Sequence, residues 1–221
     1  MVNTKLLIVF LFLTLATAPG VQAASSAGYI HALKGRATAT TTDGDVRRLR
    51  RGSELQGGEI VSTASGSYAR LRLVDKTWIM LRPDSRFVLD EVTFDEEEET
   101  GFGFFSLLKG GFRAVTGLIK KKLNYQFRTT MATIGIRGTS FMVRLCNGDC
   151  FDTYPAPANG LYIQVLEGGL VISNNAGRFT FQAGQYAYLA NANAPAVALD
   201  FPPDVFIQSP IPVADPADCV Q

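Results

Sequence analysis

The stretch from Ala132 to Phe141 reads ATIGIRGTSF, and it constrains the fold of this chain more than any other. It places Arg137 between Gly135 and Gly138 inside an apolar, β-prone run. Glycine within a strand usually marks a bulge, a tight bend or a close backbone approach. A guanidinium at such a bend has five N–H donors for nearby carbonyls and carboxylates. We therefore expect an internal clasp at a β-corner, with a ligand-binding arginine as the alternative.

Short apolar runs separated by turn signals predict an all-β fold. Residues 68–74 show the clearest alternation, with alanine and leucine on one side and two arginines on the other. Further strands are expected at 78–81, 87–92, 141–145, 161–166, 170–172 and 179–181, with turns at 43–45, 57–58, 75–76, 110–111, 147–148 and 174–175. Such a pattern is typical of sandwiches, barrels and solenoids. We predict a compact multi-stranded sandwich or solenoid-like β-domain.

Residues 102–122 form the one region that could be helical. As an amphipathic helix this region would end in Lys120-Lys121-Lys122 and could lie on a membrane. Its glycines each oppose a helix by about 1 kcal/mol relative to alanine. Two strands joined at Gly110-Gly111 therefore fit better.

The first residues have the pattern of a secretory signal peptide. Lys5 supplies a positive start, residues 6–16 an apolar core, and Val21-Gln22-Ala23 a small-residue cleavage site. The apolar run is shorter than the roughly 20 residues of a membrane span. We expect a signal peptide at 1–23, cleavage after Ala23, and a periplasmic or secreted product without a transmembrane span. An uncleaved anchor is the alternative.

The charge balance argues against nucleic-acid binding. The chain has 21 basic and 20 acidic residues, and loss of Lys5 with the signal peptide makes them equal. Binding to nucleic acid or anionic membranes requires a basic excess. The remaining length suits one β-domain, expected at 24–199. Residues 200–221 are rich in proline and predict an extended or partly disordered tail.

Three cysteines follow the expected cleavage site. Cys146 and Cys150 bracket Asn147-Gly148-Asp149, a strong turn signal. In an oxidising compartment this spacing predicts a local disulfide. A zinc site would need four ligands, and only His31 and Cys219 could complete one. Cys219 is left free, capped or paired with another molecule.

Several segments, taken in order, resemble the FecR-type domain of bacterial envelope proteins. They are GYIHALKGRATAT, LRRGSELQGGEIVSTASGSYARLRLVDKTWIMLRPDSRF, LLKGGFRAVTGLI, TTMATIGIRGTSFMV and VLEGGLVISNNAGRFTFQAGQYAYL. The family's clearest mark is the element containing Arg137, Gly138, Thr139 and Phe141. The resemblance covers residues from about Gly28 to Tyr188. It implies an all-β, non-enzymatic module for sensing or protein interaction outside the cytoplasm.

The resemblance also draws attention to Asp75-Lys76, where the family usually has an Asp-Gly turn. Lysine disfavours the positive φ that a type I′ turn requires. We expect the flanking strands to pair through a different turn.

Other candidate sites have simpler interpretations. His31, the only histidine, has no nucleophile or acid pattern around it. The acids of 95–99 repel one another and predict an exposed loop rather than a catalytic pair. The arginines of 47–51 are expected to be solvated, although they could present a basic face to a partner. Strand aromatics could stack on sugars but are more often packed, namely Tyr29, Tyr68, Trp78, Tyr125, Tyr154, Tyr162, Tyr186 and Tyr188.

The sequence therefore predicts an exported interaction, sensing or scaffolding module that is not an enzyme and uses no cofactor or metal. A protein of the bacterial envelope is the expected partner. A glycan-binding or peptidoglycan-binding module is the alternative. A carboxylate-based glycan hydrolase would need two acids converging in one cleft.

Overall fold

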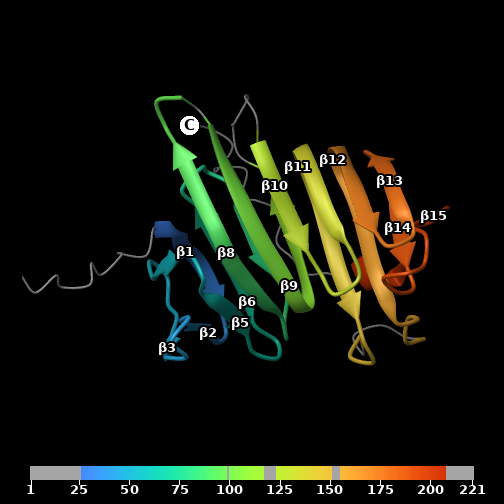
Figure 1. Cartoon of the computed structure of the whole chain (residues 1–221). Coiled ribbons are helices and arrows are strands. Elements are labelled where there is room, and N and C mark those ends of the chain that lie inside the picture. Colours follow the sequence, from blue (N-terminus) through green and yellow to red (C-terminus); the bar gives the residue numbers. More distant parts are fainter. Residues whose placement is uncertain (1–25, 99, 117–122, 151–154, 208–221) are drawn as a thin grey trace, which may run out of the picture.

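The computed structural model describes residues 26–98, 100–116, 123–150 and 155–207 (Figure 1). Most of these residues are in β-strands, as the alternating pattern predicts, and the rest are mainly in turns and loops. The expected signal peptide, Lys120-Lys121-Lys122, Tyr154 and Cys219 lie outside them.

Fifteen strands and one short helix occur among the described residues. They are β1 (Ser26–Lys34), β2 (Ala37–Thr40), β3 (Val46–Arg48), β4 (Glu54–Gln56), β5 (Ile60–Thr63), β6 (Tyr68–Leu73), β7 (Trp78–Leu81), β8 (Arg86–Asp95), β9 (Thr100–Val115), β10 (Leu123–Arg128), β11 (Thr133–Cys146), β12 (Gly160–Asn174), β13 (Gly177–Gln182), β14 (Tyr186–Leu189), β15 (Val197–Leu199) and α1 (Asp204–Ile207).

The strands form one hydrogen-bonded sheet that folds over into two layers. The first layer runs β3, β2, β5, β8, β9, β10, β11, β12, β13, and uses the first half of β9 and β11 but the second half of β12. The second layer runs β4, β1, β6, β7, β9, β11, β12, β14, β15 and uses the other halves. In Figure 1 the first layer lies in front of the second. The result is a sandwich.

Three long strands cross between the layers, and each does so at a glycine. Gly110, Gly138 and Gly168 have φ values of 82°, 59° and 72°. Residues other than glycine rarely adopt such positive φ values. The prediction of two strands joined at Gly110-Gly111 was therefore wrong, because β9 continues through a bend. Residues 161–166 and 170–172 likewise belong to one strand, β12, which bends between them.

Aromatic rings fill the space between the layers. Phe87, Phe105, Phe112, Phe127 and Phe141 are fully buried. Phe127 lies at the centre of this cluster, with ring centroids 4.9 Å from Phe105, 5.1 Å from Phe112 and 5.2 Å from Phe141. Such contacts add to the free energy gained from apolar burial. Phe141, the last residue of the ATIGIRGTSF motif, is thus a core residue.

The β6–β7 hairpin uses a turn that the sequence predicts only in part. The Leu73 carbonyl accepts a hydrogen bond from the Lys76 amide, and the Leu73 amide donates to the Thr77 carbonyl, each at 3.0 Å. This is a three-residue loop rather than a type I′ turn, so the strands pair through a different turn as expected. Lys76 nevertheless has a φ of 68°. The buried Asp75 carboxylate holds the loop by accepting from the Thr77 amide at 3.0 Å and the Thr77 hydroxyl at 2.6 Å.

The beginning of the proline-rich tail is ordered against the domain. Residues 204–207 form α1 instead of an extended segment, and Val205 and Phe206 are buried. They belong to a small apolar cluster on the outer face of the second layer, apart from the main core. Among the described residues, no helix is long and apolar enough to cross a membrane.

We predict that Lys76→Gly raises the free energy of unfolding by about 1 kcal/mol, because glycine adopts the left-handed conformation without the steric cost. Urea unfolding would measure the change. Lys76→Ala is the matched control, since alanine keeps that cost. Equal stability of the two variants would contradict the prediction.

Candidate functional site

The corner where β11 and β12 cross between the layers is built by the predicted motif. Gly138 and Gly168 lie against each other, because a Cβ on Gly168 would overlap the carbonyl oxygen of Gly138. The Thr139 hydroxyl donates to the Gly169 carbonyl at 2.7 Å, which ties β11 to β12. The Thr139 amide donates to the Thr116 hydroxyl at 2.9 Å, which ties β11 to the residue after β9. Three chain segments are therefore joined at Thr139.

Among the described side chains, Thr139 and Thr116 make the hydrogen bonds at this corner. The backbone of Arg137 pairs with Gly169 in the β11–β12 ladder, and the register shifts directly after it. The side chain of Arg137 lies outside what the structure describes. Its role as a clasp or a ligand contact therefore stays a prediction.

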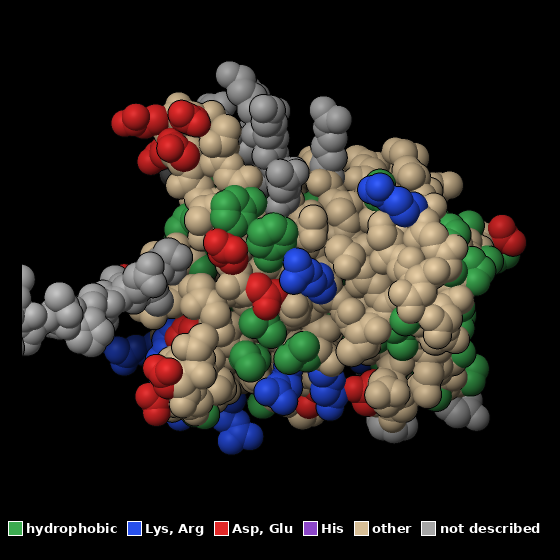
Figure 2. All heavy atoms as spheres, in the orientation of Figure 1, with side chains coloured by type: hydrophobic (Ala, Val, Ile, Leu, Met, Phe, Trp, Pro, Cys, Tyr) green, Lys and Arg blue, Asp and Glu red, His purple; other side chains and the backbone are tan. Residues whose placement is uncertain are grey.

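A shallow groove of about 490 Å³ lies on the first layer, across β10, β11, β12 and β13. Gly135 and Gly169 form part of its floor, and a Cβ on Gly135 would meet only the Val171 carbonyl oxygen, at 3.9 Å. Polar side chains of neighbouring strands also line it, namely Gln126, Arg178, Thr180 and Gln182. Most of the surface over these strands is uncharged (Figure 2). Sequence reasoning assigned Gly135 to the bend, but Gly138 makes the bend and Gly135 leaves the groove open.

Aromatic side chains lie next to this groove on the same face. Phe104 of β9 is paired with Gln126 of β10. Its ring lies 5.5 Å from the Phe102 ring, and the Arg128 guanidinium lies 5.4 Å from its centroid. Both phenylalanines are half-buried. In Figure 2, hydrophobic and charged side chains meet in the middle of this face. Neither phenylalanine was among the aromatic candidates from the sequence.

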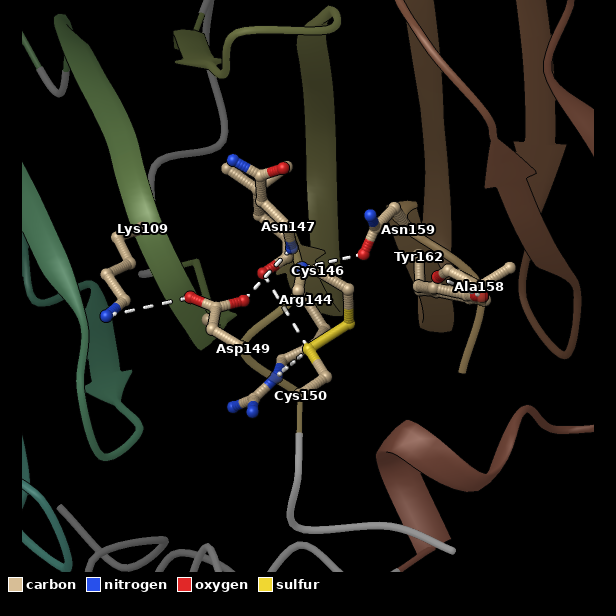
Figure 3. The surroundings of a disulfide bond; sticks show 12 residues. Lys109, Arg144, Cys146, Asn147, Asp149, Cys150, Ala158, Asn159 and Tyr162 are labelled. Carbon is tan, nitrogen blue, oxygen red and sulfur yellow. Dashed lines mark hydrogen bonds and ion pairs between the residues drawn. A yellow bond between two sulfur atoms is a disulfide. The ribbon is translucent and has the colours of Figure 1, made fainter. Parts of the chain in front are cut away.

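Cys146 and Cys150 form the predicted disulfide at the end of β11 (Figure 3). The Arg144 Nε–H donates to Cys150 Sγ at 3.2 Å. The turn between the cysteines is held by Asn159, whose side-chain oxygen accepts from the Gly148 amide at 2.7 Å, and by Lys109, which lies 3.7 Å from Asp149. The disulfide thus fixes a loop that also contacts β9 and the segment before β12.

The outer face of the second layer carries stacked cations and aromatic rings. The guanidinium carbons of Arg70 and Arg72 lie 5.3 Å and 4.2 Å from the Trp78 centroid. The His31 ring meets Trp78 edge-on at 4.8 Å. Both guanidinium groups are close enough for cation–π attraction to the Trp78 ring, which helps to hold the indole in place. His31 is therefore a half-buried packing residue. No group of three or more potential metal ligands occurs among the described residues.

Burial shifts the pKa of several groups near these surfaces. It lowers the pKa of Arg113 on the second layer, where Glu167 opposes the shift. It raises the pKa of Tyr162, with a smaller contribution from Tyr188. It also raises the pKa of Tyr125 at the groove, and the Asp75 carboxylate adds to the effect. A raised pKa favours the neutral phenol, so both tyrosines keep their protons near neutral pH.

The remaining charged candidates are placed as surface features. Asp95 accepts from the amides of Glu97 and Glu98, at 3.0 Å each, and forms an exposed turn at the tip of the β8–β9 hairpin. These acids gather at one corner of the molecule (Figure 2). In the basic cluster, Arg48, Arg50 and Arg51 are exposed. Arg47 instead binds the buried Glu59 carboxylate at 2.8 Å.

Comparison with known proteins gives one family. The sequence model of a family described as FecR protein matches residues 59–169, which include all three bends and the disulfide. Two crystal structures of a candidate anti-sigma factor from Parabacteroides distasonis ATCC 8503 align with TM-scores of 0.49 at 16% identity. The alignments cover 63% of this chain and 58% of that protein. No curated protein matches the chain.

We predict that Thr139→Val lowers the free energy of unfolding by about 1–2 kcal/mol, because the buried Thr139 side chain would no longer donate to the half-buried Gly169 carbonyl. Chemical denaturation would measure the loss. Thr93→Val, on an exposed position of β8, is the control and should change stability by less than about 0.5 kcal/mol. A loss no larger than the control's would show that this hydrogen bond does not hold the corner.

Proposed function

Because the chain belongs to the FecR family, we propose that it is an exported, non-enzymatic module that binds a protein of the bacterial envelope and serves in sensing or scaffolding. The family match carries this proposal, since it spans the structural centre of the domain. The signal-peptide pattern at 1–23, the expected cleavage after Ala23 and the disulfide support export to an oxidising compartment.

We place the binding surface at the groove on the first layer. It is open above Gly135 and is lined by amide, hydroxyl and guanidinium groups, which can donate and accept hydrogen bonds. Its floor is rigid, because it consists of paired strands of the sandwich. A rigid surface with many polar groups suits an extended segment of a partner, whose backbone supplies complementary donors and acceptors.

A glycan is the second candidate for this surface, and one observation favours it. Phe102 and Phe104 lie beside Gln126, so apolar ring surface and an amide side chain are presented together. Sugar rings can pack on aromatic rings while their hydroxyls bond to neighbouring amides. This candidate predicts that Phe104→Ala removes binding of peptidoglycan fragments.

We predict that Gly135→Leu reduces partner recovery at least about tenfold in crosslinking pull-downs, because its side chain would fill the groove. The fold should tolerate it, since the space above Gly135 is open and its φ is not positive. The pull-down would use the full chain in the native envelope, with bound proteins identified by mass spectrometry. A melting temperature close to that of the wild type would show that the variant is folded.

Gly135→Ala is the matched control, since its methyl group fits without a close contact and should leave recovery unchanged. Equal recovery of one partner by all three proteins would remove the groove from the proposal. Recovery of glycan fragments that depends on Phe104, without a protein partner, would favour the glycan candidate.

A further inference from the structure

The outer face of the second layer carries an apolar cluster that the proposed groove does not use. Its floor consists of Met80 from β7, Met142 from β11, Tyr162 from β12 and the Cys146–Cys150 disulfide. Val205 and Phe206 of α1 cover it, with 2% and 7% of their surface exposed. In Figure 3 the short helix is seen below Tyr162, at the lower right of the view.

The segment that carries α1 is attached mainly through these two side chains. Among the described residues, the backbone hydrogen bond at α1 lies within the segment itself, from the Phe206 amide to the Pro203 carbonyl at 3.0 Å. Phe201, just before the helix, is 79% exposed. A four-residue helix does not persist without tertiary contacts. The segment therefore depends on the apolar floor beneath it, whereas that floor is built on paired strands and does not depend on the segment.

The floor is suited to more than one apolar segment. Methionine is flexible and polarizable, so it adapts to different side chains. The pairing registers place alternating arginine and methionine in one row of neighbouring strands, namely Arg70, Met80, Arg113, Met142 and Gln164. The Arg113 Nε atom is buried and has no hydrogen-bond partner among the described residues. Arginine beside an apolar floor favours a segment that also carries carboxylates.

We propose that this face is a second docking groove, which takes a short apolar helical turn flanked by carboxylates from a protein partner, and that α1 is a plug that occupies the groove until the partner displaces it. The inference goes beyond the proposed function, because it concerns the opposite layer of the sandwich and a different mode of binding. The bound α1, with Val205 and Phe206 as anchors and Asp204 beside them, shows the kind of segment that fits.

The rate at which the Cys146–Cys150 disulfide is reduced measures how often α1 leaves the surface that it covers. A thiolate must reach a sulfur atom to reduce it, and both cysteines are at most 4% exposed beneath α1. In the full chain, Phe206→Ala should therefore speed reduction by dithiothreitol about tenfold, because the plug opens more often. Phe201→Ala is the matched control, with the same chemical change in the same segment, and should stay within about twofold of the wild type. Equal rates for both variants would overturn the plug.

A synthetic peptide with the sequence of residues 200–207, DFPPDVFI, tests the groove directly. It should bind the full-chain Val205→Ala/Phe206→Ala variant at least about tenfold more tightly than the wild type, in which the plug competes. The peptide DFPPDAAI is the control and should not bind. Affinity should fall as salt is raised from about 0.05 M to 0.5 M, because arginine attracts the carboxylates. Binding without salt dependence would overturn the acidic requirement, and no binding would overturn the groove.

The peptide experiment and the Gly135→Leu pull-down can succeed or fail independently of each other. If Gly135→Leu loses its envelope partner while the peptide fails to bind, the second groove is wrong and the first stands. If the peptide binds but no partner is recovered, the proposed function fails and the second groove stands. Concentration-dependent dimerisation of the Val205→Ala/Phe206→Ala variant would assign the groove to a second copy of the chain and overturn the proposal.

Discussion

Three strands of this domain bend sharply and exchange one or both of their hydrogen-bonded neighbours as they pass between the layers, and the rest of the structure depends on how they do so. A single sheet can enclose a core only if some strands pass from one layer to the other. In β9, β11 and β12 the passage is made at Gly110, Gly138 and Gly168, where a positive φ turns the strand. The Phe127 cluster then fills the space that the bends enclose.

The bends also determine where binding surfaces form. Because β11 crosses between the layers, its first half contributes Gly135 to the groove on the first layer. Its second half contributes Met142 and Cys146 to the apolar cluster on the second layer. Substitutions at the corner would therefore affect both surfaces together, whereas Gly135 and Phe206 allow each surface to be tested alone.

The FecR family relationship and the geometry of the motif describe the same domain in different ways. The family match identifies the type of domain. The geometry explains why the motif has its composition: Gly138 turns the strand, Thr139 ties it to β12, and Phe141 enters the core. Each of these residues serves the fold, so we propose that a partner binds at the surfaces beside the motif and not at the motif itself.

The sequence alone determined the all-β class, the Cys146–Cys150 disulfide and the inward positions of β6, because these depend on alternation and spacing along a few residues. It also located the corner, since glycine adopts a positive φ without the steric cost that other residues bear. Tertiary structure alone decided that Gly110 bends a continuous strand, that Lys76 adopts a positive φ and that Phe206 is buried while Phe201 is exposed. Those outcomes depend on contacts between segments far apart in the chain, which local patterns do not record.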